Sequence, residues 1–182
     1  MKRVLSILSV AGLMSAVVLV SVARSPVATS APKQKDEAMA VLESRSGSSV
    51  TGTAKFKQKG SAVEATIEIK GAKPGQHGLH LHETGDCSAP DAKTAGAHFN
   101  PDSKAHGAPD ADPHHAGDLG NITVGNDGKG KLKISIKGLT VAPGPHSVVG
   151  RAVIVHADPD DLKSQPAGNA GARFACGVVK GE

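Results

Sequence analysis

Three histidines lie within six residues in the segment HGLHLHETGDC, residues 77–87, and a cysteine follows them. Side chains of a β-strand alternate between its two faces, so His80 and His82 would project together while the intervening leucines point into a core. The segment therefore predicts a two-histidine metal clamp on a stiff strand. His77 falls on the leucine side, and we expect it to be an interior imidazole that hydrogen-bonds to the backbone.

More imidazoles and one carboxylate follow in a polar segment: His98, His106, His114, His115 and Asp118. These are ligand types that zinc takes in a closed tetrahedral site. His156 ends the apolar run RAVIVH. Burial of both faces of that run predicts a loop over the outer face, with His156 emerging beside the clamp. His146 has no such neighbours, and we interpret it as a surface residue.

Short alternating runs, separated by glycine, proline, asparagine and aspartate, predict the elements that position these residues. The expected strands lie near residues 38–45, 49–57, 62–70, 77–83, 117–124, 131–137, 148–156 and 172–179. NDGKG at 126–130 is a hairpin signal. The prediction is an all-β sandwich or barrel of about eight strands. Two connections, 83–116 and 157–171, are too long for hairpins, and such loops are usually functional or disordered.

The first 31 residues show the pattern of a secretory signal, with a basic start, an apolar run at 4–20 and small residues for cleavage near 23 or 31. The alternative is an uncleaved anchor, since this almost entirely apolar run of 17 residues reaches the lower limit for a membrane span. Residues 32–37 are a predicted flexible tether and 38–182 a single domain. In the oxidising compartment that export implies, Cys87 and Cys176 are predicted to form a disulfide, with two unpaired buried thiols as the alternative.

The predicted exported part carries 18 lysines and arginines against 17 acids, a net charge of +1. Tryptophan and tyrosine are absent. We therefore expect no basic, aromatic-lined surface for nucleic acid, and no membrane contact beyond the signal segment. The scattered lysines are interpreted as solvated strand faces.

Six blocks of the sequence carry a resemblance to a known family. The blocks HGLHLHETGDC, AHFNP, HGAP, HAGDLGN, GRAVIVHADPDDL and GNAGARFACGVV occur in this order over roughly residues 38–180. Together they closely resemble the copper/zinc superoxide dismutase family, specifically its secreted bacterial members. The resemblance implies an eight-stranded Greek-key β-barrel, an immunoglobulin-like sandwich with two long functional loops, and a periplasmic or secreted superoxide dismutase.

The resemblance also implies a role for each candidate site residue. The copper ligands would be His80, His82, His98 and His156. The zinc ligands would be His98, His106, His115 and Asp118, so that the His98 ring bridges the two metals. Alignment on GDLGN selects His115 rather than His114. Asp160 would link His80 to His106, Arg173 would lie beside the open copper position, and Cys87 with Cys176 would match the intrasubunit disulfide.

The implied reaction is the disproportionation of superoxide to oxygen and hydrogen peroxide, with copper cycling between two oxidation states, zinc ordering its loop and His98 supplying a proton. The segment from His156 to Arg173 is shorter than in eukaryotic members and lacks their charged cluster, with Lys163 as a candidate for steering superoxide. Two alternative functions are a copper- or zinc-buffering protein of the cell envelope and a zinc hydrolase. Metal buffering would not explain Arg173, and for a hydrolase no carboxylate is obviously placed to activate a water beside the clamp. A copper-only relative is disfavoured because the zinc-type ligands are present. Monomer and homodimer both remain open.

Overall fold

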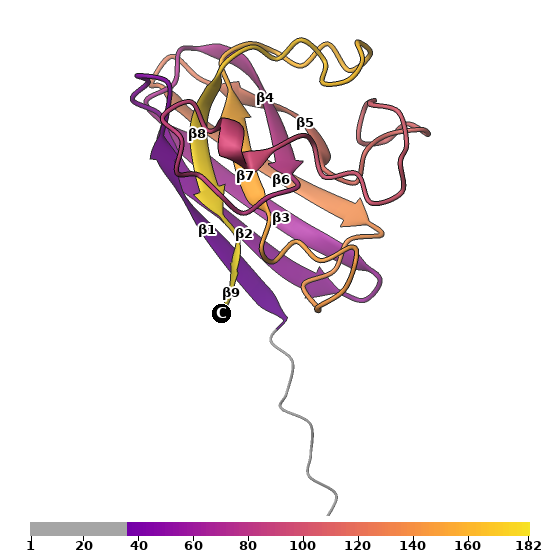
Figure 1. The fold of residues 1–182 in the computed structure, drawn as a ribbon. Coiled ribbons are helices and arrows are strands. Elements are labelled where there is room, and N and C mark those ends of the chain that lie inside the picture. Colours follow the sequence, from indigo (N-terminus) through magenta and orange to yellow (C-terminus); the bar gives the residue numbers. More distant parts are fainter. Residues whose placement is uncertain (1–35) are drawn as a thin grey trace, which may run out of the picture. The chain divides into compact units, whose positions relative to one another are not determined.

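The structure is a computed structural model that describes residues 36–182 (Figure 1). The predicted signal segment and residues 32–35 of the predicted tether lie outside the described residues. The strands are β1 (Glu37–Ser44), β2 (Thr51–Lys59), β3 (Ala62–Lys70), β4 (Gly75–His82), β5 (Asp118–Val124), β6 (Lys129–Lys137), β7 (Ala152–His156), β8 (Arg173–Val178) and β9 (Lys180–Gly181). One 3₁₀ turn, η1 (Lys93–Ala95), is the only helical element between residues 36 and 182, and no helix there is long and apolar enough to cross a membrane.

The strands form a closed antiparallel barrel. Neighbours follow the order β2, β3, β6, β5, β4, β7, β8, β1, and the pairing of β1 with β2 closes the ring, while the short β9 adds to β1. The connections from β3 to β4 and from β6 to β7 each pass over two intervening strands, and these are the long crossings of a Greek key. The prediction of an all-β, eight-stranded barrel is therefore confirmed.

Alternation of apolar and polar residues produces the core. Every second residue of β3 is buried, and the barrel interior is filled by large side chains that include Leu42, Phe56, Ile67, Leu79, Leu81, Leu119 and Ile122. A second, smaller cluster lies outside the barrel, where Ile154 packs against Ala92 and Ala95 of the long loop after β4. The predicted loop over the outer face of the 148–156 run is thus confirmed.

Two details of the predicted strands can be checked directly. The hairpin at NDGKG is confirmed, because the amide of Gly125 donates to the carbonyl of Lys129 at 2.9 Å and Gly128 has a φ of 73°. The predicted start of a strand at residue 148 is wrong. Gly150 turns the chain with a φ of 82°, a conformation that favours glycine, and strand β7 begins only at Ala152.

The long loop after β4 returns to that strand before β5 begins. The amide of Phe99 donates to Leu81, that of Gly117 to Phe99 and that of Leu81 to Gly117, at 2.8, 2.8 and 2.9 Å. A Cβ at Gly117 would lie 2.3 Å from the Leu81 carbonyl oxygen, so the close approach requires glycine here. This backbone ladder holds His98 beside the two histidines of β4.

Candidate metal centre

Buried side chains form two groups, and inside each group the ligand atoms all lie within 4.8 Å of one another. We call the first the histidine group: His80, His82, His98 and His156. We call the second the mixed group: His98, His106, His115 and Asp118. The residues come from β4, β5, the end of β7 and the long loop after β4, and His98 belongs to both groups.

Each ring of the histidine group is oriented by a hydrogen bond at one nitrogen. His82 Nδ1 donates to the Gly96 carbonyl at 2.9 Å, and His156 Nδ1 donates to the Gly171 carbonyl at 3.2 Å. His80 uses Nε2, which donates to Asp160 Oδ2 at 2.8 Å. These bonds fix the tautomers, so the lone pair lies on the other nitrogen of each ring.

The mixed group gathers around one carboxylate oxygen. Asp118 Oδ1 lies 2.9 Å from His98 Nδ1, 3.0 Å from His106 Nδ1 and 3.3 Å from His115 Nδ1. Its other oxygen accepts the amides of Gly107 and His115 at 3.1 and 2.8 Å. Burial raises the pKa of Asp118, but the hydrogen bond from His98 and these two amides outweigh it and hold the pKa well below its ordinary value.

Five buried ring nitrogens have no hydrogen-bond partner in the described part of the chain: His80 Nδ1, His82 Nε2, His98 Nε2, His106 Nδ1 and His156 Nε2. Buried polar atoms are normally paired, and an unpaired lone pair on imidazole is the donor that copper and zinc use. The four of these atoms that belong to the histidine group converge on one point. The residues present therefore fit one metal ion in each group.

Burial keeps three rings of the histidine group uncharged. It lowers the pKa of His80 and of His82 well below the ordinary value and lowers that of His156 to about 4. Neutral imidazole is the form that binds a metal, so no proton has to be displaced from these rings at neutral pH.

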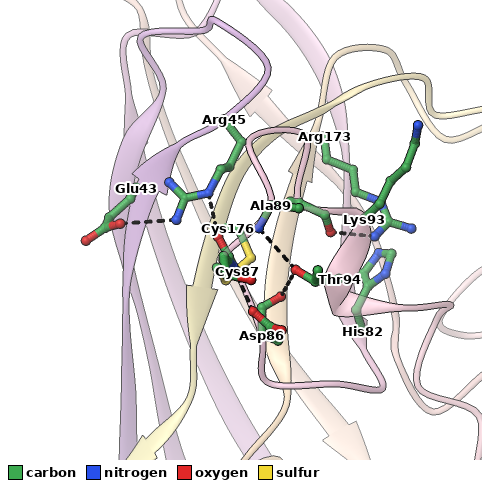
Figure 2. Close-up of a disulfide and its surroundings, with 12 residues drawn as sticks. Glu43, Arg45, His82, Asp86, Cys87, Ala89, Lys93, Thr94, Arg173 and Cys176 are labelled. Carbon is green, nitrogen blue, oxygen red and sulfur yellow. Dashed lines mark hydrogen bonds and ion pairs between the residues drawn. A yellow bond between two sulfur atoms is a disulfide. The ribbon is translucent and has the colours of Figure 1, made fainter.

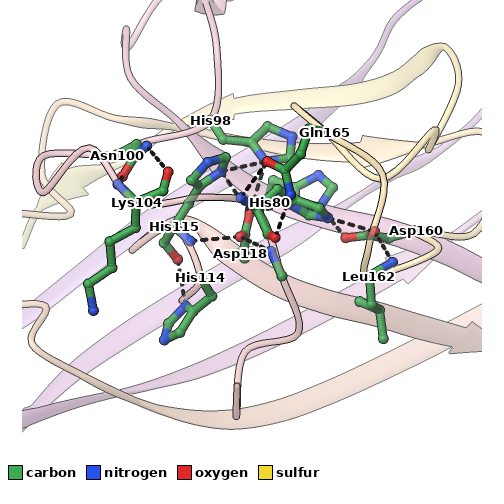
Figure 3. A network of polar contacts seen from close by, with 12 residues as sticks. His80, His98, Asn100, Lys104, His114, His115, Asp118, Asp160, Leu162 and Gln165 are labelled. Atoms are coloured by element: carbon green, nitrogen blue, oxygen red, sulfur yellow. Dashed lines mark hydrogen bonds and ion pairs between the residues drawn. The ribbon is translucent and has the colours of Figure 1, made fainter. Parts of the chain in front are cut away.

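Asp160 joins the two groups from outside both of them (Figure 3). Its carboxylate accepts from His80 Nε2 at 2.8 Å and from His106 Nε2 at 3.0 Å. The Asn121 side-chain amide pairs with the Asp160 backbone at 2.8 and 2.9 Å. Gly168, with a φ of 63°, leaves room for this carboxylate, because a Cβ there would lie 1.8 Å from Asp160 Oδ1. The resemblance predicted Asp160 but not the support from Asn121 and Gly168.

Arg173 and the edges of His82, His98 and His156 line one cleft, together with the end of the 157–171 loop. The guanidinium donates to the Ala92 carbonyl at 2.8 Å and to the Gly96 carbonyl at 2.7 Å. The Gly96 oxygen therefore accepts from both Arg173 and His82, side chains that lie close together in Figure 2. Burial lowers the pKa of Arg173 somewhat, but a guanidinium stays charged at neutral pH.

The predicted disulfide is present. Cys87 and Cys176 are bonded across 89 residues, with their Cα atoms 5.8 Å apart, and tie the loop after β4 to β8 (Figure 2). The Cys87 carbonyl accepts a 2.9 Å hydrogen bond from Arg45 Nε. The disulfide therefore fixes the loop that carries both carbonyl partners of Arg173, Ala92 and Gly96.

The three remaining histidines, Glu83 and Lys163 lie outside both ligand groups. His77 is buried and its two ring nitrogens lie 2.9 Å from the carbonyl oxygens of His156 and Lys73, which confirms an interior imidazole held by the backbone. His114 lies outside both groups, bonded to the His115 carbonyl, and His146 pairs with Asp102 near the surface. Glu83, which follows His82 in the sequence, lines the cleft, and its carboxylate accepts the Ala97 amide at 3.1 Å. Lys163 is exposed and does not line the cleft.

A closed antiparallel barrel with adjacent imidazole and imidazole–carboxylate sites defines a class of metalloprotein, and comparison with known proteins agrees. The family model of copper/zinc superoxide dismutase (SODC) matches residues 50–179. The crystal structure of the clock protein EA4 is similar to this chain, with a TM-score of 0.75 and 34% sequence identity, over 84% of this chain and 98% of that chain. The chain belongs to the copper/zinc superoxide dismutase family, which consists of oxidoreductases that bind copper and zinc and act on superoxide.

Proposed function

We propose that this chain disproportionates superoxide outside the cytoplasm, with copper held by the histidine group, zinc by the mixed group and the ring of His98 shared between them. The observation that carries the proposal is the convergence of four unpaired imidazole nitrogens beside a cleft that contains a guanidinium. The net reaction turns two superoxide ions and two protons into oxygen and hydrogen peroxide.

The donor sets support this assignment of the two metals. Neutral imidazoles suit both oxidation states of copper, whereas three imidazoles and a carboxylate form a common closed zinc site. When bound, copper supplies a one-electron couple, and zinc supplies a fixed positive charge without redox chemistry. The protein's residues then have to bind the anion, orient it and deliver protons.

Arg173 is the residue proposed to bind superoxide. Its permanent charge and forked donors suit a small anion, and the two carbonyl contacts restrict the directions that the guanidinium can take. Since the cleft also exposes the edges of three rings of the histidine group, an anion bound to Arg173 would lie next to them. Positive potential in a cleft of this kind raises association rates by roughly 10 to 10³-fold at low salt.

His98 is the residue proposed to supply a proton. Its Nδ1 lies 2.9 Å from Asp118, while its Nε2 is unpaired and belongs to the histidine group. Nε2 is therefore the ring atom that could hold a proton on the substrate side whenever it is not bound to copper, and give that proton to the reduced product.

The Cys87–Cys176 disulfide supports a location in the periplasm or outside the cell, because such bonds persist in oxidising compartments. The signal-like sequence of residues 1–31 supports the same location.

The test is superoxide decay after loading with both metals, measured by stopped-flow spectroscopy. Arg173→Ala should lower the second-order rate at least about tenfold and weaken its dependence on salt. Lys73→Ala removes an exposed charge away from the cleft and should leave the rate unchanged. Binding of both metals without superoxide decay would contradict the proposal and favour a metal-buffering protein.

A further inference from the structure

Eight lysines project from the outer surface of three neighbouring strands. They are Lys55, Lys57 and Lys59 of β2, Lys70 of β3, and Lys129, Lys131, Lys133 and Lys137 of β6. All eight are exposed, and only two acids, Glu64 and Glu68, project from the same surface of these strands. We call this surface the lysine face.

The register of the strands sets the lysines in rows. Ala62 of β3 lies between Lys59 of β2 and Lys137 of β6. Thr66 of β3 lies in the same way between Lys55 and Lys133. Lys70 lies directly opposite Lys129. Like charges facing each other across a sheet destabilise the pairing, so this arrangement costs the fold stability.

Charge is separated between the lysine face and the rest of the molecule. Residues 36–182 contain 16 lysines and arginines and 17 acids, of which the face holds 8 and 2. Its formal charge is therefore +6, and the remainder of the same residues carries −7. The overall balance of the sequence conceals this separation, which is why the net charge of +1 predicted no basic surface.

Much of the positive charge on the face is not neutralised by neighbours. Lys57 pairs with Glu37 and Lys131 with Glu68 at 2.6 Å, and Lys129 lies 3.9 Å from Asp127. The other five lysines have no ion pair among residues 36–182: Lys55, Lys59, Lys70, Lys133 and Lys137. These five leave a broad cationic surface for an anionic partner.

The border of the face favours lipid over a soluble polyanion. Strand β1 pairs with β2, and its outward Met39 and Val41 lie opposite Lys55 and Thr53. Val41 is 59% exposed and is the only large exposed hydrophobic residue of 36–182. The 35 residues that precede the described part, whose sequence includes the apolar run at 4–20, join the barrel at this same strand.

We propose that the lysine face docks on a lipid surface that carries anionic headgroups. Lysines near such a surface are attracted within about a Debye length, and apolar border residues add contact with the interface. In the ring of strands, β3 is four positions from β7 in both directions. His156 and the cleft therefore lie across the barrel from the lysine face, so a docked molecule would turn its metal centre away from the lipid.

Sedimentation of the full chain with phosphatidylglycerol vesicles tests the proposal, with phosphatidylcholine vesicles as the neutral comparison. Changing Lys55, Lys59, Lys133 and Lys137 together to Gln should weaken binding to the anionic vesicles at least about tenfold. The matched control changes Lys73, Lys93, Lys104 and Lys163 to Gln, which lowers the net charge equally but leaves the face and its border intact. Its binding should stay within about twofold of the parent chain.

Equal losses in the two variants would show that net charge alone acts, and would overturn the proposal. A second result would also overturn it: the parent chain binds heparin, the face variant binds heparin more weakly, and the parent chain binds anionic vesicles no better than neutral ones. If the fourfold variant fails to fold, Lys70→Gln with Lys129→Gln should weaken vesicle binding while relieving a like-charge pair. Vesicle binding does not depend on bound metal, so its outcome is independent of the proposed dismutase activity.

Discussion

The two ligand groups share the His98 ring but are held together in different ways. In the histidine group, each remaining ring is positioned by a hydrogen bond at the nitrogen that faces away from the point of convergence. In the mixed group, three rings lie around one oxygen of Asp118. One edge of the barrel can therefore provide a site of imidazoles alone, reached from a cleft, beside a site that carries the negative charge of a carboxylate.

Removing one member from each group should separate their metals. His82→Ala is expected to remove copper and reduce superoxide decay at least about a hundredfold while zinc is retained, because His82 belongs only to the histidine group. Asp118→Ala is expected to remove zinc while copper is retained, since it deletes the only charged ligand of the mixed group. Elemental analysis of both variants checks this. Parallel loss of both metals in both variants would break the distinction between the groups.

Loss of the disulfide should weaken the fold and the cleft more than the mixed group. On the chain-entropy model, opening a loop of 89 residues costs about 4 to 5 kcal/mol of unfolding free energy. We expect this loss in urea unfolding of Cys87→Ser with Cys176→Ser. Superoxide decay should fall more than zinc content, because the freed loop carries the carbonyl partners of Arg173. A variant that loses zinc while its superoxide decay per bound copper is unchanged would contradict this, because the disulfide would then support the mixed group.

Acid should act on the histidine group of the metal-free protein before it acts on Asp118. The folded pKa of His156 is about 4, below the ordinary value of 6.5, so the unfolded chain binds more protons between these values. Stability is therefore full above about pH 6.5 and falls as the pH drops towards 4, by roughly 3 kcal/mol for His156 alone. His80 and His82 shift in the same direction. Unfolding free energies that stay constant from pH 7 to pH 5 would contradict this.

Asp160 contacts both groups, so its removal should not discriminate between them. Asp160→Asn keeps the shape but cannot accept from His80 and His106 as a carboxylate does, and affinity for each metal should fall about 10 to 100-fold. Competition with a chelator measures both affinities. Asp158→Asn, an exposed change in the same loop, serves as the control. A change in one metal only would show that Asp160 does not connect the groups.

The smallest effect is expected at Gln165, which sequence reasoning did not identify. Its side-chain amide accepts from the His106 amide at 2.8 Å and donates to the His106 carbonyl at 2.9 Å. Gln165→Ala should weaken the mixed group by about 1 kcal/mol, several-fold in zinc affinity, and leave copper affinity unchanged. The absorption spectrum of cobalt in the zinc position provides a second readout. An unchanged spectrum and affinity would show that these bonds do not position His106.

The sequence predicts the site well where chemistry is carried by residue type. Histidine spacing and the six family blocks identify the members of both groups, and strand alternation separates His77 from His80 and His82. Supporting residues are less visible, since the roles of Asn121 and Gln165 depend on contacts between segments about 40 or more residues apart, and that of Gly168 on the folding of its own loop around Asp160. Strand ends are also harder to predict, because Gly150 turns a run of residues whose apolar pattern continues.

The lysine face illustrates a second limit. A net charge of +1 describes the expected exported chain correctly, but strand order and register decide that 8 lysines share one surface. Residues that are interspersed with acids along the sequence become neighbours only when β3 lies between β2 and β6.

The most direct test of the account is a crystal structure of the loaded protein with anomalous scattering recorded at the copper and zinc edges. We expect copper bonded to Nε2 of His98 and to His80, His82 and His156, and zinc bonded to Nδ1 of the same His98 ring. Two metals without a shared ring, or a single metal in either group, would contradict the assignment.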